Sequence, residues 1–136
     1  MKVVVSMGNP IKSDDNIGNV ILDRIDVEAT KLKAETTPEN FIDKLNGYDE
    51  IIIIDALEFE GEVGQVKRFD LDKVDDRILS THSIPIEMFK KFLPNSKITI
   101  IGIKPSNIDF GEELSDELNE KLDTISKEVE DIINAL

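Results

Sequence analysis

The chain has 136 residues and a mass of 15.3 kDa, which suits one domain, expected to cover residues 1–136. It contains no cysteine, which excludes disulfides, thiolate metal sites and a cysteine nucleophile. Its 29 acidic and 16 basic residues give a formal net charge of -13, so the chain repels phosphate backbones and we expect no nucleic-acid partner.

The first third of the chain alternates between strand and helix patterns. Residues 2–7 form a short apolar run typical of a buried strand, and residues 17–25 place apolar side chains at helical spacing. Residues 27–35 alternate with period two, which predicts a strand with one polar face. Pro38 suits the first turn of a helix that ends before Gly47.

The remaining elements continue this alternation. Residues 50–55 include four consecutive isoleucines, which indicates a strand buried on both faces, as in parallel sheets. Residues 65–70 suit either another strand of that sheet or a hairpin partner. Helix spacing returns over residues 85–93, a strand pattern over 97–103, and a long apolar helical stripe over 115–136.

This order of elements predicts a three-layer α/β/α fold, with a mostly parallel sheet of about five strands and helices on both faces. In such sheets, ligands bind beyond the carboxyl ends of the strands. The residues that follow each predicted strand are therefore the candidates for function.

Three of these positions carry chemistry that could converge on one ion. Asp15 follows the first strand, Asp55 ends the isoleucine strand, and His82 is the only histidine of the chain. Two carboxylates and one imidazole suit a divalent cation such as Ni²⁺, Zn²⁺ or Fe²⁺, whereas Mg²⁺ prefers oxygen ligands alone. The competing interpretation of Asp14 and Asp15 is structural, because acids at a helix start cap it and favour its dipole.

The residues as a set resemble those of the hydrogenase maturation proteases. The resemblance covers most of the chain and rests on four segments: GNPIKSDDNIG at 8–18, IIIIDA at 51–56, Thr81-His82, and IGIKP with DFGEELS between 101 and 115. It implies an α/β fold with a twisted sheet between helices. It also implies an endopeptidase that removes the C-terminal extension of a [NiFe]-hydrogenase large-subunit precursor once nickel has been inserted.

By position, the resemblance assigns metal contact and catalysis to Asp15, Asp55 and His82. The nickel would belong to the substrate, although Ni²⁺ or another divalent ion could also occupy the site, and Gly8 and Asn9 would shape the loop beside it. Two residues depart from the family pattern. Asn16 stands where glycine is frequent and tolerates a positive φ comparatively well. Lys104 stands where glutamine is frequent, which puts a cation near the site.

This implies a mechanism in which the precursor's nickel docks among these side chains and brings the scissile peptide beside them. Either a carboxylate activates water as a general base, with Asp14 in reserve, or the metal polarises the carbonyl. A serine or cysteine triad is excluded, because the single imidazole is His82 and no thiol exists.

Two alternatives stay open. A signalling receiver domain also has an acidic pair, a phosphoacceptor aspartate, here Asp55, and a Lys-Pro pair, here Lys104-Pro105. However, seven residues separate Met7 from Asp15, whereas receivers place the acidic pair directly after the strand. The second alternative is a divalent-metal-binding module without catalysis.

Partners and location follow from the same observations. We expect the large-subunit precursor as partner and a monomer, because that partner must enter an open cleft. No apolar run approaches the ~20 residues of a membrane span. The first residues enter a strand pattern without a signal-peptide layout, so we expect no membrane partner and a cytoplasmic location.

Overall fold

The centre of the computed structural model is the strand that contains the four consecutive isoleucines. The structure describes residues 1–35, 42–71, 79–80, 86–111 and 113–136. Residues Ile51, Ile52, Ile53 and Ile54 are fully buried, because neighbouring strands flank this strand and a hydrophobic core covers each of its faces. The predicted two-sided burial is confirmed.

Six strands form the sheet: β1 (Lys2–Met7), β2 (Thr30–Glu35), β3 (Glu50–Glu58), β4 (Val66–Asp70), β5 (Leu79–Ser80) and β6 (Lys97–Ile103). The main order is β2-β1-β3-β6-β4. The first four strands of that order are parallel, whereas β4 pairs antiparallel with β6 at the edge, and β5 pairs antiparallel with the end of β3. The 65–70 segment is therefore a strand of the same sheet.

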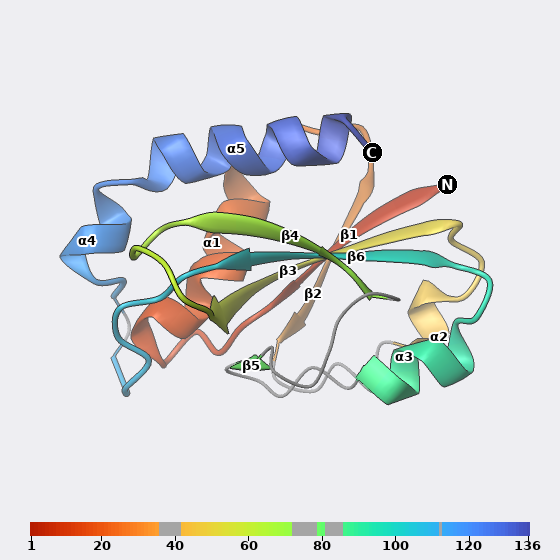
Figure 1. Cartoon of the computed structure of the whole chain (residues 1–136), viewed down its shortest axis with the longest axis horizontal. Helices are drawn as coiled ribbons and strands as arrows, with labels where there is room; N and C mark the ends of the chain where they lie inside the picture. The colour runs from red at the N-terminus through yellow and green to blue at the C-terminus, as the bar shows by residue number, and fades with distance from the viewer. Residues whose placement is uncertain (36–41, 72–78, 81–85, 112) are drawn as a thin grey trace.

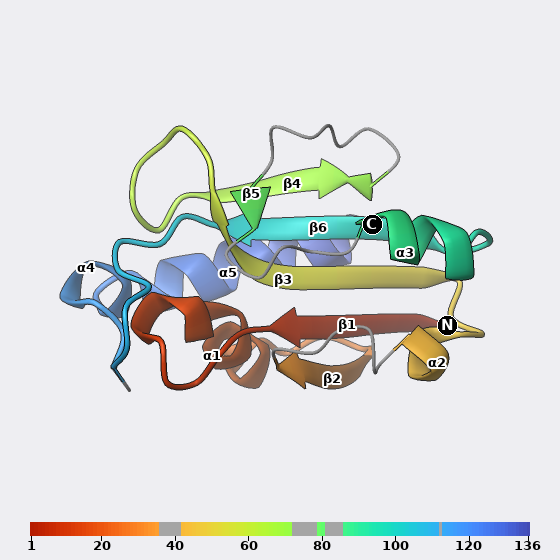
Figure 2. The same ribbon diagram turned by 90° about the horizontal axis from the view of Figure 1, so that it is seen from below.

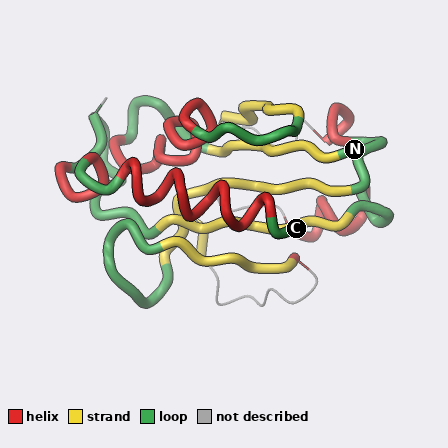
Figure 3. The backbone as a smooth tube through the Cα atoms, turned by 90° about the horizontal axis from the view of Figure 1, so that it is seen from above, coloured by secondary structure: helices red, strands yellow, loops and turns green. Residues whose placement is uncertain are grey.

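Helices cover both faces of the sheet (Figures 1 and 2). They are the 3₁₀ turn η1 (Ser13–Asn16), α1 (Ile17–Arg24), α2 (Ile42–Leu45), α3 (Ile86–Phe92), α4 (Asp116–Asn119) and α5 (Leu122–Asn134). Side chains of α1, α4 and α5 pack into one core, and those of α2 and α3 pack into the other. Figure 3 shows α5 lying over the strands on its face. The predicted three-layer arrangement with a mostly parallel sheet is confirmed.

The predicted helix over 115–136 is in fact two helices. Ser115 caps the first of them, because its side chain accepts a hydrogen bond from the Leu118 N–H. The chain then turns at Glu120 and Lys121 before α5 begins. Lys121 donates from Nζ to the Val63 carbonyl at 2.6 Å and packs along Gly64, so the break lies at a contact with a distant turn.

One predicted boundary also moves. The second strand begins at Thr30 instead of residue 27, because a turn precedes it in which the Ala29 N–H bonds the Val27 carbonyl at 3.1 Å. The predicted start of the 38–45 helix lies outside the described residues, and its described part is α2.

Gly18 lets α1 pack directly on the carboxyl ends of two strands. A Cβ at this position would lie 2.6 Å from the Ile54 carbonyl oxygen and 2.7 Å from that of Met7. Only a residue without a side chain fits between these two backbone groups. The start of α1, and η1 before it, are thereby held against the ends of β1 and β3.

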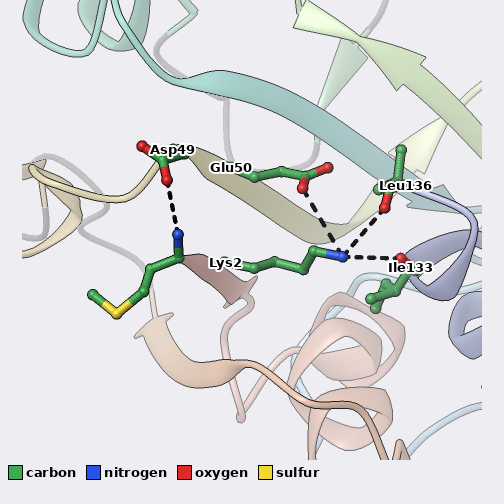
Figure 4. A network of polar contacts seen from close by, with 6 residues as sticks. Lys2, Asp49, Glu50, Ile133 and Leu136 are labelled. Carbon is green, nitrogen blue, oxygen red and sulfur yellow. Dashed lines mark hydrogen bonds and ion pairs between the residues drawn. The ribbon is translucent and has the colours of Figure 1, made fainter.

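Polar contacts at the opposite, amino end of the sheet join the two ends of the chain (Figure 4). The Lys2 Nζ donates to the carbonyls of Ile133 and Leu136, at 3.3 and 3.5 Å, and lies 3.9 Å from Glu50 Oε2. A cation at the last carbonyls of a helix is favourable because it satisfies unpaired acceptors and opposes the helix dipole. The β1 strand is thus tied to the end of α5.

Candidate functional site

The candidate site lies where the carboxyl ends of β1, β3 and β6 meet. The register aligns Ser6 with Ile54 and Asp55 with Gly102, so these strands end near one level. The loop that follows β1 turns through η1, and η1 contacts β3. Figure 1 shows this edge on the side of α4, away from the N-terminus.

Asp15 is held in η1 by its own loop and is only 3% exposed. Its N–H bonds the Lys12 carbonyl at 3.0 Å, and its Oδ2 accepts the Asn9 N–H at 3.3 Å. Gly8 passes so close that a Cβ there would lie 2.7 Å from the Asp15 carbonyl oxygen. Gly8 and Asn9 therefore both contact Asp15, as the resemblance implied.

Asp55 is fully buried within β3, in the row that pairs with Gly102 of β6. Side chains alternate along a strand, so Asp55 faces the same side as Ile53 and Leu57, whose core includes α3. The prediction that the strand ends at Asp55 is wrong, because β3 continues to Glu58. The last two residues, Leu57 and Glu58, pair with β5, a two-residue strand that local pattern does not reveal.

His82 and Thr81 lie outside the described residues. The described residue nearest to them on their amino side is Ser80, which pairs with Leu57 in the antiparallel β3–β5 ladder. Within the described ranges alone, no group of three or more histidine, cysteine or acidic residues could hold a metal ion. The convergence of Asp15, Asp55 and His82 therefore stays a prediction.

Asp14 has a different role from Asp15, although the two are adjacent. It is fully buried, and Ser115 donates to its carboxylate twice, from N to Oδ1 at 2.7 Å and from Oγ to Oδ2 at 2.8 Å. The N–H groups of Ser106 and Asn107 also donate to Oδ2, at 2.8 and 2.9 Å. Asp14 thus ties the loop after β6 to the loop after β1.

The structural interpretation of the acidic pair as a cap for the helix that begins at Ile17 is wrong for Asp14. No side chain caps the start of α1 at Asn16, and the partners of Asp14 are about a hundred residues away in the chain. Asn16 has a φ of -84°, so its replacement of a frequent glycine requires no tolerance of positive φ. The positive φ of this loop belongs instead to Ser13, at 46°.

A buried network of polar side chains supports the loop that follows β1. This network was not predicted from the sequence. Ser6 donates from Oγ to Asn19 Oδ1 at 2.6 Å, and Asn19 Nδ2 donates to Asn16 Oδ1 at 2.8 Å and to the Gly8 carbonyl at 3.3 Å. Buried polar groups are expected to be paired in this way. The signal in the sequence was an asparagine beside the apolar face of the predicted 17–25 helix.

Known proteins share this arrangement of elements. The family model for hydrogenase maturation proteases matches residues 21–132 of the chain. A Methanocaldococcus jannaschii protein assigned as a hydrogenase maturation protease is 31% identical over an alignment of 125 positions, which covers 79% of this chain and 74% of that protein.

Two solved structures from Thermococcus kodakarensis have the same fold. The [NiFe] hydrogenase maturation protease HycI matches with a TM-score of 0.77 at 24% identity, over 98% of this chain and 92% of that one. The protease HybD matches with a TM-score of 0.76 at 26% identity, over 97% and 99%.

The strand order defines an α/β protein, and its buried acids lie at the carboxyl ends of the strands, the edge at which such folds generally bind ligands. The chain belongs to the hydrogenase maturation protease family and is a peptidase. None of the helices in the described part of the chain has the length and apolar composition that a bilayer crossing needs.

Membership of a peptidase family decides against the non-catalytic alternative, and the geometry decides against the receiver alternative. The receiver interpretation requires Lys104 to contact a phosphoryl group on Asp55, yet Lys104 Nζ lies 2.6 Å from Glu58 Oε2. Receiver sheets follow the order 2-1-3-4-5. Here the outer position belongs to the antiparallel β4, which precedes β6 in the chain.

Proposed function

We propose that this peptidase removes the C-terminal extension of a [NiFe]-hydrogenase large-subunit precursor after nickel insertion. In this proposal Asp15, Asp55 and His82 contact the nickel, which the substrate carries into the site. The chain's own residues then hold the scissile peptide bond near that ion. The maturation proteases HycI and HybD, named for [NiFe] hydrogenase, share this chain's fold and support the choice of substrate.

The strongest support is the burial of two acids on adjacent elements of one edge. Asp15 is 3% exposed and Asp55 is fully buried, and the turn that carries Asp15 contacts the strand that carries Asp55. Carboxylate oxygens are among the ligands that first-row divalent cations take in proteins. Two carboxylates at this one edge therefore support recognition of a divalent cation that the substrate carries.

The β3–β5 ladder supports the inclusion of His82. Ser80 pairs with Leu57, which lies two residues beyond Asp55. Two residues of extended chain span at most about 7 Å. An imidazole two residues after Ser80 therefore needs no long excursion to reach the edge that holds Asp55.

The reaction is the hydrolysis of one peptide bond. Water adds to the scissile carbonyl carbon, the C–N bond breaks, and the leaving amine takes up a proton. Asp15 or Asp55 removes the proton from water, or the nickel polarises the carbonyl. Asp14 is left out of this set because its two oxygens already accept four hydrogen bonds from residues 106–115.

The test is cleavage of the cognate precursor, purified with and without nickel, followed by intact mass. We expect the wild-type chain to shorten only the nickel-loaded form. Asp15→Asn, Asp55→Asn and His82→Ala should each lower the rate by at least about a hundredfold, the range for loss of a catalytic acid–base group. Glu128→Gln, an exposed acid of α5, is the matched control and should cleave normally. Normal cleavage by all three site variants would overturn the assignment.

The monomeric state and the cytoplasmic location stay predictions. The expected precursor must reach the edge of the sheet, and a single copy of the chain leaves that edge open to it. Gel filtration with light scattering tests the oligomeric state, and fractionation of the source cells tests the location.

A further inference from the structure

Exposed apolar side chains gather on the two loops beside the site. Among the described residues, five large apolar side chains are strongly exposed: Met1 at 79%, Ile11 at 52%, Phe92 at 56%, Ile108 at 40% and Phe110 at 78%. Three of these lie on the loops that follow β1 and β6, which run side by side in Figures 1 and 2. We call Ile11, Ile108 and Phe110 the apolar loop patch.

The two loops hold each other in place. The Gly111 N–H bonds the Ile11 carbonyl at 2.8 Å, and the Ser13 N–H bonds the Gly111 carbonyl at 2.6 Å, which makes a short parallel bridge. The buried carboxylate of Asp14 also joins these two loops, because it accepts hydrogen bonds from the N–H groups of Asn107 and Ser115. A surface ordered in advance loses little conformational entropy when a partner binds.

The patch protrudes. A phenylalanine that is 78% exposed cannot lie in a groove of its own protein, so its partner must supply the hollow. Lys12 holds its ammonium 5.3 Å from the centre of the Phe110 ring, which steadies the ring without covering it. An extended C-terminal tail has no hollow to offer, whereas a folded surface does.

The patch is continuous with the proposed site. The Lys12 carbonyl accepts a hydrogen bond from the Asp15 N–H. Ile11 of the patch is therefore the sequence neighbour of a residue that contacts Asp15 directly. A protein that delivers a nickel ion to Asp15 must therefore come to rest against the same loops. Aromatic side chains at the centre of an interface often contribute much of its binding free energy.

We propose that the apolar loop patch docks into an apolar hollow on the folded body of the nickel-loaded precursor, apart from the extension that is removed. This inference rests on the proposed function and adds the surface that selects the substrate. We infer that these docking contacts are equally strong in the substrate complex and in the transition state, which is uniform binding. Loss of the patch should therefore raise KM and leave kcat unchanged.

The first test compares Phe110→Ser with Phe92→Ser on the nickel-loaded precursor. Phe92 is a matched control, because it is 56% exposed at the far end of the sheet and also has a lysine near its ring, Lys91 at 5.6 Å. We expect Phe110→Ser to raise KM about tenfold with kcat preserved, and Phe92→Ser to change neither. Thermal unfolding of both variants should match the wild type, because both side chains are exposed.

The outcomes separate the two proposals. If the wild type fails to cleave the precursor, the proposed function fails and takes this inference with it. If the wild type cleaves and Phe110→Ser has the same KM, only the docking inference fails. A fall in kcat at unchanged KM would also overturn it, because the patch would then act on the reaction itself.

A second test places a photo-crosslinking amino acid at position 110 and identifies what it captures. Crosslinks to the folded body of the precursor would support the proposal. Crosslinks only to the removable extension, or to a second copy of this chain, would overturn it. The same label at position 92 should capture no precursor.

Discussion

The two ends of the sheet differ in whether their acidic side chains are exposed or buried. At the amino end, the N-terminal ammonium pairs with Asp49 at 2.8 Å while both groups are largely exposed. At the carboxyl end, Asp14, Asp15 and Asp55 are buried. An exposed ion pair contributes little because water screens it, whereas a buried carboxylate requires specific partners. Location in the fold, not residue type, therefore separates the exposed acid of the amino end from the buried acids of the carboxyl end.

The carboxyl end itself combines two uses of acid in adjacent residues. Asp14 binds four donors of residues 106–115 and builds the loop pair, whereas Asp15 faces the edge that we assign to the substrate. Four substitutions test this contrast between the two ends of the sheet.

The largest effect is expected from Asp14→Ala. It leaves the N–H groups of Ser106, Asn107 and Ser115 without their acceptor, so the free energy of unfolding should fall by roughly 3 kcal/mol. Urea denaturation measures this change. Asp109→Ala, which changes an exposed acid of the loop after β6, is the control and should cost less than about 0.5 kcal/mol. Equal effects of the two variants would show that Asp14 does not hold the loops.

Gly18→Ala should destabilise the protein by about 2 kcal/mol, although alanine is ordinarily the better helix former. The added methyl would lie 2.6 and 2.7 Å from two strand carbonyl oxygens and would push α1 off the sheet. Gly111→Ala is the matched control, because its nearest neighbour would be 4.0 Å away. A gain in stability for Gly18→Ala would contradict the close packing described above.

Lys2→Met should cost about 1 kcal/mol at the amino end, since it removes a cation from the last carbonyls of α5. The loss should shrink in high salt, and cleavage of the precursor should stay at the wild-type rate, because Lys2 lies at the opposite end from the site. Denaturation at two salt concentrations and a cleavage assay check both points. Reduced cleavage at full stability would show that the two ends are coupled.

Asp49→Asn should have the smallest effect. The hydrogen bond from the N-terminal ammonium, and then its charge, lower the pKa of Asp49 below its ordinary value of 3.8. A carboxyl whose pKa is lowered on folding stabilises the folded state above the ordinary value, and this contribution disappears as pH falls through the folded value. The small advantage of the wild type over the variant should therefore persist at neutral pH and disappear as the pH falls below 3.8. An advantage that grows on acidification would have the wrong sign.

Local pattern was sufficient for most of the fold. The isoleucine run predicted the central strand, and the spacing of apolar residues predicted α1, α3 and β6 within a few residues. The division at Glu120 and Lys121 was not predictable, because it lies at a contact with Val63 and Gly64, far away in the chain. The antiparallel strand β5 was also missed, because a strand of two residues is too short to show an alternating pattern.

The site was only partly predictable. The positions of the motifs predicted that Asp15 and Asp55 lie at one edge of the sheet. For Asp14, however, they predicted a helix cap or a reserve general base. Its real partners, Ser106, Asn107 and Ser115, belong to a distant part of the chain that the parallel pairing of β1, β3 and β6 brings beside it. Hydrogen bonds between residues about a hundred positions apart leave no trace in local sequence.

The most direct test of the account is the position of the nickel in the complex of this chain with its nickel-loaded precursor. Anomalous diffraction from a crystal of that complex locates the ion without assumptions about ligands. We predict one nickel ion within bonding distance, about 2 Å, of side-chain atoms of Asp15, Asp55 and His82. A nickel ion seated away from these three side chains, or an imidazole of His82 directed away from it, would contradict the account.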